Sequence, residues 1–307
     1  MSTCVNTTTI TTSRLAFYSF DFVTTDATGN YPASGIASPT YVNGWVSSAV
    51  SFMASNAQRF SAGNIPLDSR SFTIEFWFYA TNIGSWDYSF MGEWSSSAPN
   101  RCLFINIRNQ KLFFGFFNDD TAANTVLVAN RWYHAAFVYD YTTRRRAIYL
   151  NGIKDGETTA INHFLGSSVP FTIGGARIGG STTADVYYSG IIDHVTVSER
   201  VKTDCEIYLD ANLACYFTFD SFSPLIDSGP NFLIANNTGA TGANGRVNQS
   251  LQFSSSSSYI TIENISALMS DRQAFSIAMW INPMNTSGGA TLVHAATQNN
   301  GLHSRSI

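Results

Sequence analysis

The chain has 307 residues, of which 44% are hydrophobic, 14% are aromatic and 12% are charged. Charged residues are about half as frequent as the roughly 25% that is usual in soluble domains, so Ser, Thr, Asn and Gly must form most of the polar surface. The net charge of −4 gives no basic field for nucleic acid, and no apolar run reaches the ~18 residues of a membrane-spanning helix. The composition indicates a globular chain rich in strands, because aromatic and β-branched residues favour sheets.

A sequence motif near the N-terminus recurs in the last third of the chain. Leu-Ala-Phe-Tyr-Ser-Phe-Asp at 15–21 is repeated as Leu-Ala-Cys-Tyr-Phe-Thr-Phe-Asp at 213–220. Further on, Ser-Phe-Thr-Ile-Glu-Phe-Trp at 71–77 is repeated as Ala-Phe-Ser-Ile-Ala-Met-Trp at 274–280. Ordered matches at nearly constant spacing indicate an internal repeat.

The repeat predicts an organisation in three parts. Residues 1–12 form an N-terminal tail, residues 13–210 one complete domain, and residues 211–307 a second domain that is incomplete at its C-terminal end. Half of a sandwich would leave strand edges unpaired, which promotes aggregation. We therefore expect the chain to be a fragment or the product of a truncated gene model.

Alternating hydrophobicity predicts the first long strand. Apolar side chains occupy every second position from Phe72 to Phe78, with polar or amphipathic residues between them. This period of two is typical of a strand with one face in the core. The same alternation from Phe275 to Ile281 predicts a matching strand in the second copy, on which Trp280 is structural.

Many short strands follow in the first copy, separated by turns rich in Gly and Asn. Asn151-Gly152 is typical of a tight hairpin turn of the primed type. The pattern as a whole predicts an all-β sandwich. The predicted elements after residue 100 are strands at 103–107, 111–117, 132–139, 146–150, 171–175 and 190–197 and a short helix at 203–209.

Several motifs of the first copy resemble one known superfamily. They include Arg-Trp-Tyr-His-Ala-Ala-Phe-Val-Tyr-Asp at 131–140, Ile-Tyr-Leu-Asn-Gly at 148–152 and Gly-Ile-Ile-Asp-His-Val at 190–195. With these motifs the chain resembles the laminin G-like, concanavalin A-like jelly-roll superfamily, which also contains pentraxins. The resemblance implies an antiparallel two-sheet jelly-roll sandwich in tandem copies, the second of them truncated.

The resemblance also implies a function. Domains of this kind are extracellular or cell-surface binding modules, so we expect a non-catalytic, lectin-like module that recognises a glycan or an extracellular protein, with calcium as a candidate cofactor. The alternative is a structural or adhesion spacer repeat of a large surface or matrix protein. No secretory signal is visible at the N-terminus.

A glycoside hydrolase is a third interpretation, because the superfamily also contains glycosidases. Such enzymes need two carboxylates that flank the sugar bond, and the family's glucanases carry them on one strand as E-x-D-x-x-E. This triplet is absent here, and Glu75 and Asp193 each stand alone on their strands. His134 lies in a strand pattern and is expected to make a core contact. We therefore expect no enzymatic activity.

Two loops offer oxygen ligands of the kind that calcium prefers. The first contains Asp26 and Asn30, and the second, a weaker candidate, contains Asp119 and Asp120. Asp and Asn also form turns without any metal, so an ordinary Asx turn is the alternative for the first loop. A solvated hairpin tip is the alternative for the second.

Three aromatic residues that follow the first long strand are candidate ligand-binding residues. Trp86, Tyr88 and Trp94 lie close together in the sequence, and aromatic faces beside carboxylates can stack on sugars or bind cations. Packing beneath a long loop is the alternative. By contrast, Trp77 and Trp132 lie on predicted strands and are expected to be structural.

The cysteines and the glycosylation motifs bear on the compartment. One disulfide is predicted between Cys205 and Cys215, with a bond from Cys4 to one of these two as an alternative, and buried free thiols as another. Cys102 is expected to stay free. The Asn-x-Ser/Thr acceptor motifs, which agree with an extracellular chain, begin at Asn6, Asn236, Asn248, Asn264 and Asn285.

Overall fold

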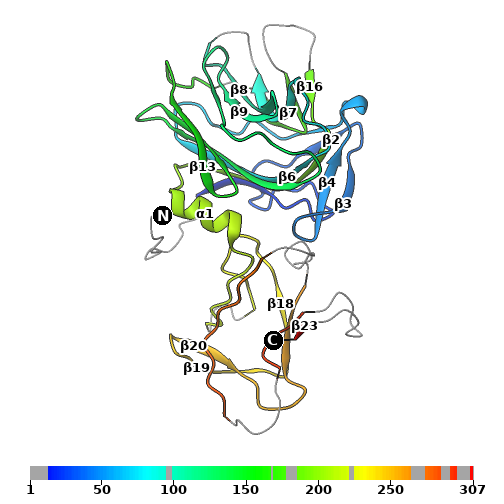
Figure 1. The fold of residues 1–307 in the computed structure, drawn as a ribbon, viewed down its shortest axis with the longest axis vertical. Coiled ribbons are helices and arrows are strands. Elements are labelled where there is room, and N and C mark those ends of the chain that lie inside the picture. Colours follow the sequence, from blue (N-terminus) through cyan, green and yellow to red (C-terminus); the bar gives the residue numbers. More distant parts are fainter. Residues whose placement is uncertain are drawn as a thin grey trace. The chain divides into compact units, whose positions relative to one another are not determined.

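The computed structural model describes residues 13–94, 99–166, 169–177, 185–220, 225–263, 274–284, 291–295 and 305–306. The chain divides into two compact units, Met1–Leu213 and Ala214–Ile307. Strands form most of the first unit, whereas the described residues of the second unit have only short strands joined by longer segments without regular structure (Figure 1). No helix among the described residues is long and apolar enough to cross a membrane.

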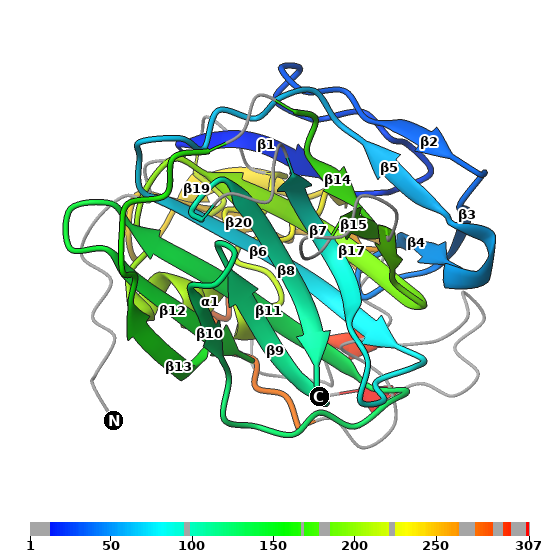
Figure 2. The same cartoon turned by 90° about the horizontal axis from the view of Figure 1, so that it is seen from above.

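The first unit is a sandwich of two antiparallel sheets, called sheets A and B (Figure 2). Sheet A has the order β13-β12-β11-β6-β17-β4-β3, and β1 pairs with β17 as its eighth strand. Sheet B has the order β10-β9-β8-β7-β14-β5-β2. The predicted all-β sandwich is therefore confirmed.

Several elements follow the sequence pattern, since β6 covers the predicted alternation and α1 overlaps the predicted helix, but the pattern did not predict β7 or β13. The strands of sheet A are β1 (Arg14–Tyr18), β3 (Thr40–Asn43), β4 (Ser48–Phe52), β6 (Phe72–Ala80), β11 (Trp132–Asp140), β12 (Arg145–Leu150), β13 (Ile153–Thr159) and β17 (Gly190–Ser198). The strands of sheet B are β2 (Ser34–Ile36), β5 (Arg59–Ser61), β7 (Tyr88–Trp94), β8 (Cys102–Arg108), β9 (Lys111–Gly115), β10 (Asp120–Ala122) and β14 (Thr172–Ile173). The remaining elements of this unit are η1 (Ala54–Asn56), β15 (Gly175–Arg177), β16 (Asp185–Tyr187) and α1 (Asp204–Asn212).

Aromatic side chains from both sheets form the core. Phe76 of β6 lies 5.0 Å from Phe90 of sheet B and 5.9 Å from Phe137 of β11, measured between ring centroids. All three are fully buried. Because alternate residues of a strand point to opposite faces, the inward positions of β6 hold the sheets together, and its outward positions meet other groups.

Asp193 of β17 fixes the turn between β3 and β4. Its Oδ2 accepts hydrogen bonds from the backbone N–H groups of Trp45, at 2.8 Å, and Val46, at 3.1 Å. Its Oδ1 lies 2.8 Å from Nδ1 of His194. Trp45 then stacks on Trp77 of β6 at a centroid distance of 3.9 Å. Trp77 is buried, as expected for a structural residue.

Helix α1 covers part of the outer face of sheet A. Thr203 and Glu206 form a capping box, in which each side chain accepts a hydrogen bond from the other residue's backbone N–H. Ile207 packs into a cluster with Tyr149 of β12, and the Tyr149 hydroxyl donates to Asp204 Oδ1 at 2.7 Å. The helix therefore starts at a well-defined residue and is held against the sheet.

The second unit repeats strand pairings of the first. The antiparallel pair Ser34–Ser61 of β2 and β5 has a counterpart in Ala235–Ile262, each residue 201 positions further on. The hairpin of β3 and β4 has a counterpart with the same shift. The strands of this unit are β18 (Ala235–Thr238), β19 (Thr241–Asn244), β20 (Gln249–Gln252), β21 (Tyr259–Ile262), β22 (His294–Ala295) and β23 (Arg305–Ser306).

The strand predicted from Phe275 to Ile281 is wrong. Residues 274–284 belong to no strand, and Trp280 is 80% exposed, with the Arg246 guanidinium 5.4 Å from its ring centroid. In the first unit, β6 pairs with a strand on each side. No described strand of the second unit pairs with residues 274–284, so the alternation alone does not produce a strand. A complete second copy stays a prediction.

Replacing Phe76 by Ala should lower the free energy of unfolding by about 3–5 kcal/mol, because it leaves a cavity between the sheets. Urea-induced unfolding of the full chain measures this change. Ile153→Ala is the control, because Ile153 is 66% exposed and its loss should change stability by only about 0.5 kcal/mol or less. Equal effects of the two substitutions would contradict the assignment of the core.

Candidate functional site

A pocket of about 220 Å³ opens on the outer face of sheet B. Its lining includes Arg59 and Ser61 of β5, Trp94 of β7 and Thr172 of β14. These positions alternate with buried core residues such as Phe60, so they point away from the core. We call this site the sheet B pocket.

Small residues make room for the pocket. Gly92 of β7 and Ala176 of β15 both line it. A Cβ at Gly92 would lie 2.3 Å from the carbonyl oxygen of Leu103 on β8, which is closer than real contacts allow, and 3.1 Å from the Cβ of Ala176, which is a tight contact. Glycine is therefore required by the neighbouring strand β8 and leaves room for the β15–β16 hairpin, which forms one wall.

Tyr187 of β16 and Arg59 of β5 form a contact across the pocket. Arg59 Nη1 donates to the Tyr187 hydroxyl at 2.7 Å, and its Cζ lies 5.4 Å from the ring centroid. This distance is within the range of a cation–π interaction. The contact fixes the position of the guanidinium beside the cavity.

Trp94 is held by aromatic packing on the same face of sheet B. Its ring meets Phe117 edge to face at 5.7 Å, and it packs against the buried cluster of Cys102, Phe104 and Phe113. The indole is half-buried, so one part is fixed and another lines the cavity. A half-exposed, well-positioned indole is suited to stack on a ligand.

The structure does not bring the three predicted aromatic ligand residues together. Trp94 lines the sheet B pocket, but Trp86 is 79% exposed in the loop before β7. Tyr88 begins β7, whereas Trp94 ends it, which separates them by about 20 Å along the strand. Tyr88 is partly buried and packs against the main core.

Asp26 and Asn30 do not have the geometry of a calcium site. Asp26 Oδ1 accepts from the N–H groups of Phe17 and Thr28, and Oδ2 accepts from those of Asn30 and Tyr31 and from the Thr28 hydroxyl. These hydrogen bonds outweigh the effect of burial and lower the pKa of Asp26. N–H donors thus occupy the positions that a cation would need, and the loop is an Asx-type turn.

In the second candidate pair for calcium, the carboxylate of Asp119 is engaged with other groups. Asp119 is buried, and its Oδ1 accepts from Arg146 Nη2 at 2.5 Å. Its Oδ2 accepts from the Ile161 N–H at 2.7 Å. Asp120 is exposed, and it lies next to this ion pair on the chain. Among the described residues, no group of three or more His, Cys, Asp or Glu side chains has the arrangement of a metal site.

The disulfide predicted between Cys205 and Cys215 is not formed. Cys215 is a free, partly buried thiol, whereas Cys205 is disulfide-bonded. Cys205 lies in the first turn of α1 and Cys215 beyond the end of that helix, so the two are attached to different units. Cys102 is buried and forms no disulfide, as expected, and the alternative through Cys4 lies outside the described residues.

Two of the five predicted glycosylation sites can be placed. Asn236 is exposed on β18, and Asn248 is exposed in the turn between β19 and β20. Both are accessible, and their modification stays a prediction. Asn6, Asn264 and Asn285 lie outside the described residues.

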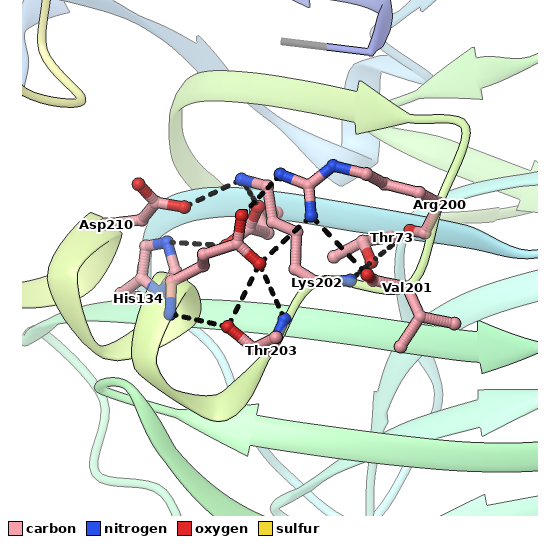
Figure 3. Close-up of polar contacts among 9 residues, drawn as sticks. Thr73, His134, Arg200, Val201, Lys202, Thr203 and Asp210 are labelled. Carbon is pink, nitrogen blue, oxygen red and sulfur yellow. Dashed lines mark hydrogen bonds and ion pairs between the residues drawn. The ribbon is translucent and has the colours of Figure 1, made fainter. Parts of the chain in front are cut away.

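A cluster of charged side chains is buried under helix α1 on the outer face of sheet A (Figure 3). Lys202 Nζ donates a short hydrogen bond to Glu75 Oε2 on β6 and another, at 2.7 Å, to Asp210 Oδ2 on α1. His134 Nε2 on β11 lies 4.0 Å from Glu75 Oε1. Lys202 therefore joins a carboxylate of the sheet to a carboxylate of the helix.

Burial controls the ionisation of this cluster. It raises the pKa of Glu75 to about 7, against the attraction of Lys202, and lowers the pKa of His134 to about 4. Burial alone would lower the pKa of Lys202, but Glu75 and Asp210 raise it. His134 is thus a neutral, buried contact residue, as expected. The cluster fastens α1 to the sheet, and shifted pKa values are also typical of structural ion pairs.

Sequence reasoning missed several residues that these two sites require. Arg59, Thr172 and Tyr187 line the pocket, and Lys202 and Asp210 complete the buried cluster. The sequence does carry one signal for the position of Arg59. This residue directly precedes the apolar Phe60 in a short apolar–polar alternation, which is typical of a strand residue that points away from the core. The other partners are brought together only by strand pairing between distant segments.

Residues 53–208 match the model of the concanavalin A-like lectin/glucanases superfamily. The match spans half of the chain, and the chain therefore belongs to this superfamily. The sandwich and its two sheets agree with that assignment.

No curated protein matches the chain, but solved structures share its fold. Domain 4 of AbnA, a GH43 extracellular arabinanase from Geobacillus stearothermophilus solved with arabinotriose, is 18% identical with a TM-score of 0.52. The match covers 64% of this chain and 97% of that domain. A structure of botulinum neurotoxin type C is 12% identical with a TM-score of 0.50, over 67% of this chain and 53% of that one.

Chelation followed by addition of calcium should leave the melting temperature unchanged, because the oxygens of Asp26 already accept hydrogen bonds. Asp26→Ala should instead lower stability by roughly 1–3 kcal/mol, since several buried N–H groups lose their acceptor. Differential scanning calorimetry of the full chain measures both. A calcium-dependent rise in melting temperature that disappears in Asp26→Ala would contradict this interpretation of the loop.

Replacing Lys202 by Met should cost about 3–5 kcal/mol of stability at pH 8, because it leaves Glu75 buried without its cation. The cost should shrink at pH 5. The folded-state pKa of Glu75 lies above its unfolded value, so protonation favours the folded state, and this contribution is lost as the pH rises through about 7. Urea unfolding at the two pH values measures the difference.

Two further variants make this test specific. Lys154→Met removes a lysine that is paired with Glu157 on the surface, and should cost less than about 1 kcal/mol at both pH values. In the double variant Glu75→Gln with Lys202→Met, the extra cost at pH 8 should disappear. A Lys202→Met cost that does not depend on pH would exclude Glu75 as the cause.

Proposed function

We propose that the chain is a non-catalytic, extracellular, lectin-like module that binds a glycan in the sheet B pocket. The observation that carries this proposal is the combination of the Trp94 indole, the Tyr187 ring and the Arg59 guanidinium around one cavity. Aromatic faces stack on the apolar C–H faces of sugar rings, and polar groups beside them determine orientation.

The size of the pocket agrees with this ligand class. At about 220 Å³, it is smaller than the roughly 300–1,000 Å³ of sites that enclose whole small molecules. It is suited to one sugar ring of a longer glycan, with the rest of the chain outside. The hydroxyls of Ser61 and Thr172 lie on the same lining, although Thr172 already donates to the Gly92 carbonyl at 3.0 Å.

Membership of the superfamily and one structural neighbour support the proposal. The superfamily contains both lectins and glucanases, and domain 4 of AbnA was solved with a bound trisaccharide. Because a shared fold does not transfer a ligand, the argument for this chain depends on its own pocket. An extracellular location agrees with the chain's low content of charged residues.

The lining of the pocket also favours binding over hydrolysis. Glycosidases place two carboxyl groups about 5–10 Å apart on either side of the sugar bond. None of the described residues that line the sheet B pocket is Asp or Glu. The paired carboxylates Glu75 and Asp210 share a lysine beneath α1, where no substrate is expected to reach them.

Replacing Trp94 by Ala should weaken glycan binding roughly tenfold, because the stacking surface is lost. A glycan array with the full chain identifies the ligand, and a calorimetric titration then compares the variants. Both are run with calcium and with chelator, so that any dependence of binding on calcium is measured.

Trp86→Ala is the matched control, since Trp86 is exposed and does not line the pocket. It should leave the affinity unchanged. No binding to any glycan in either condition, by a folded chain, would overturn the proposal in favour of a protein ligand or a spacer role. Equal losses in the two tryptophan variants would exclude the sheet B pocket as the site.

A further inference from the structure

Among the described residues, no carboxylate pairs with Arg59, whereas five other arginines of the first unit have such a partner. Five arginines form ion pairs with an acidic side chain at 3.0 Å or less, namely Arg70, Arg108, Arg145, Arg146 and Arg200. Within the described residues, the only polar side-chain partner of Arg59 is the neutral Tyr187 hydroxyl. No acidic side chain of the described residues therefore neutralises its positive charge.

The position of this charge points to a ligand. Arg59 is half-buried and lines the sheet B pocket, so part of its hydration shell is lost. Burying a charge without a partner is costly, and an anionic ligand group would compensate for that cost. The chain has a net charge of −4, so its overall charge does not attract anions, and any attraction must be local to this pocket.

The guanidinium is also preorganised. Its contact with the Tyr187 ring at 5.4 Å and the hydrogen bond through Nη1 fix its position. An arginine has five N–H donors, so this contact leaves four for a ligand. A fork of parallel N–H donors matches the two oxygens of a planar carboxylate.

We propose that the sheet B pocket recognises an acidic sugar, whose carboxylate pairs with Arg59 while its ring stacks on Trp94. This inference depends on the glycan-binding function proposed above and names the class of sugar. The carboxylate lies in the plane of the guanidinium, and the apolar face of the ring lies against the indole. Neutral sugars of the same shape bind more weakly, because they leave the guanidinium unpaired.

The test compares three oligosaccharide probes by calorimetric titration of the full chain. The probes are an oligomer of uronic acid, the same oligomer with its carboxyl groups reduced to alcohols, and a sulfated neutral oligomer. The uronic acid oligomer should bind about 10–100-fold more tightly than its reduced form, the range expected for a hydrogen bond to a charged group. Its affinity should fall as salt is added.

Variants of Arg59 test whether this residue causes the preference for the acidic oligomer. Arg59→Met should remove the preference for the acidic oligomer, and Arg59→Lys, which keeps the charge but not the fork, should retain part of it. Arg131→Met is the control, because Arg131 is exposed and does not line the pocket. It should leave the preference unchanged. Melting temperatures show whether each variant is folded.

The outcomes separate this inference from the proposed function. If the reduced oligomer binds as tightly as the acidic one, with Trp94 required, the glycan-binding function stands and the acidic preference is wrong. Tighter binding of the sulfated oligomer would overturn the assignment of a carboxylate. If none of the probes and no glycan on an array binds, both proposals fail.

Discussion

The first unit depends on strand β6, which is buried on both faces. Its inward side chains, such as Phe76, join the two sheets. Its outward side chains meet separate structures, because Glu75 lies under α1 and Trp77 stacks on Trp45. A strand that must satisfy two different environments accepts few substitutions. The same strand therefore determines how the sheets pack and where the helix attaches.

In sheet B the same alternation of inward and outward side chains has a different result. Its inward residues complete the core, whereas its outward residues, among them Arg59 and Trp94, remain partly accessible and surround the pocket. The core therefore orients the binding groups without contacting a ligand itself. A rigid sheet is a good support for recognition, because its side chains need little reordering when a ligand binds.

Local patterns in the sequence predicted several long strands and the helix of the first unit, but not β7, β13, most of the short strands or the sites. Alternation is a property of neighbouring residues, and it located β6 correctly. The same alternation around Trp280 failed, because a strand also needs partners. The pocket contact between Arg59 and Tyr187 spans 128 positions, and the contact between Glu75 and Lys202 spans 127. Only the pairing of strands brings such residues together, so no local pattern reveals them.

The β15–β16 hairpin gives the pocket one wall that is not part of either large sheet. It forms a two-stranded sheet of its own, and Tyr187 connects it to β5 through Arg59. Small elements of this kind open locally at a lower free energy than the core strands. Occupation of the pocket would then slow amide hydrogen exchange in this hairpin and leave the exchange of β6 unchanged. Ligand binding would then reduce local opening of the hairpin, without any rearrangement of the sandwich.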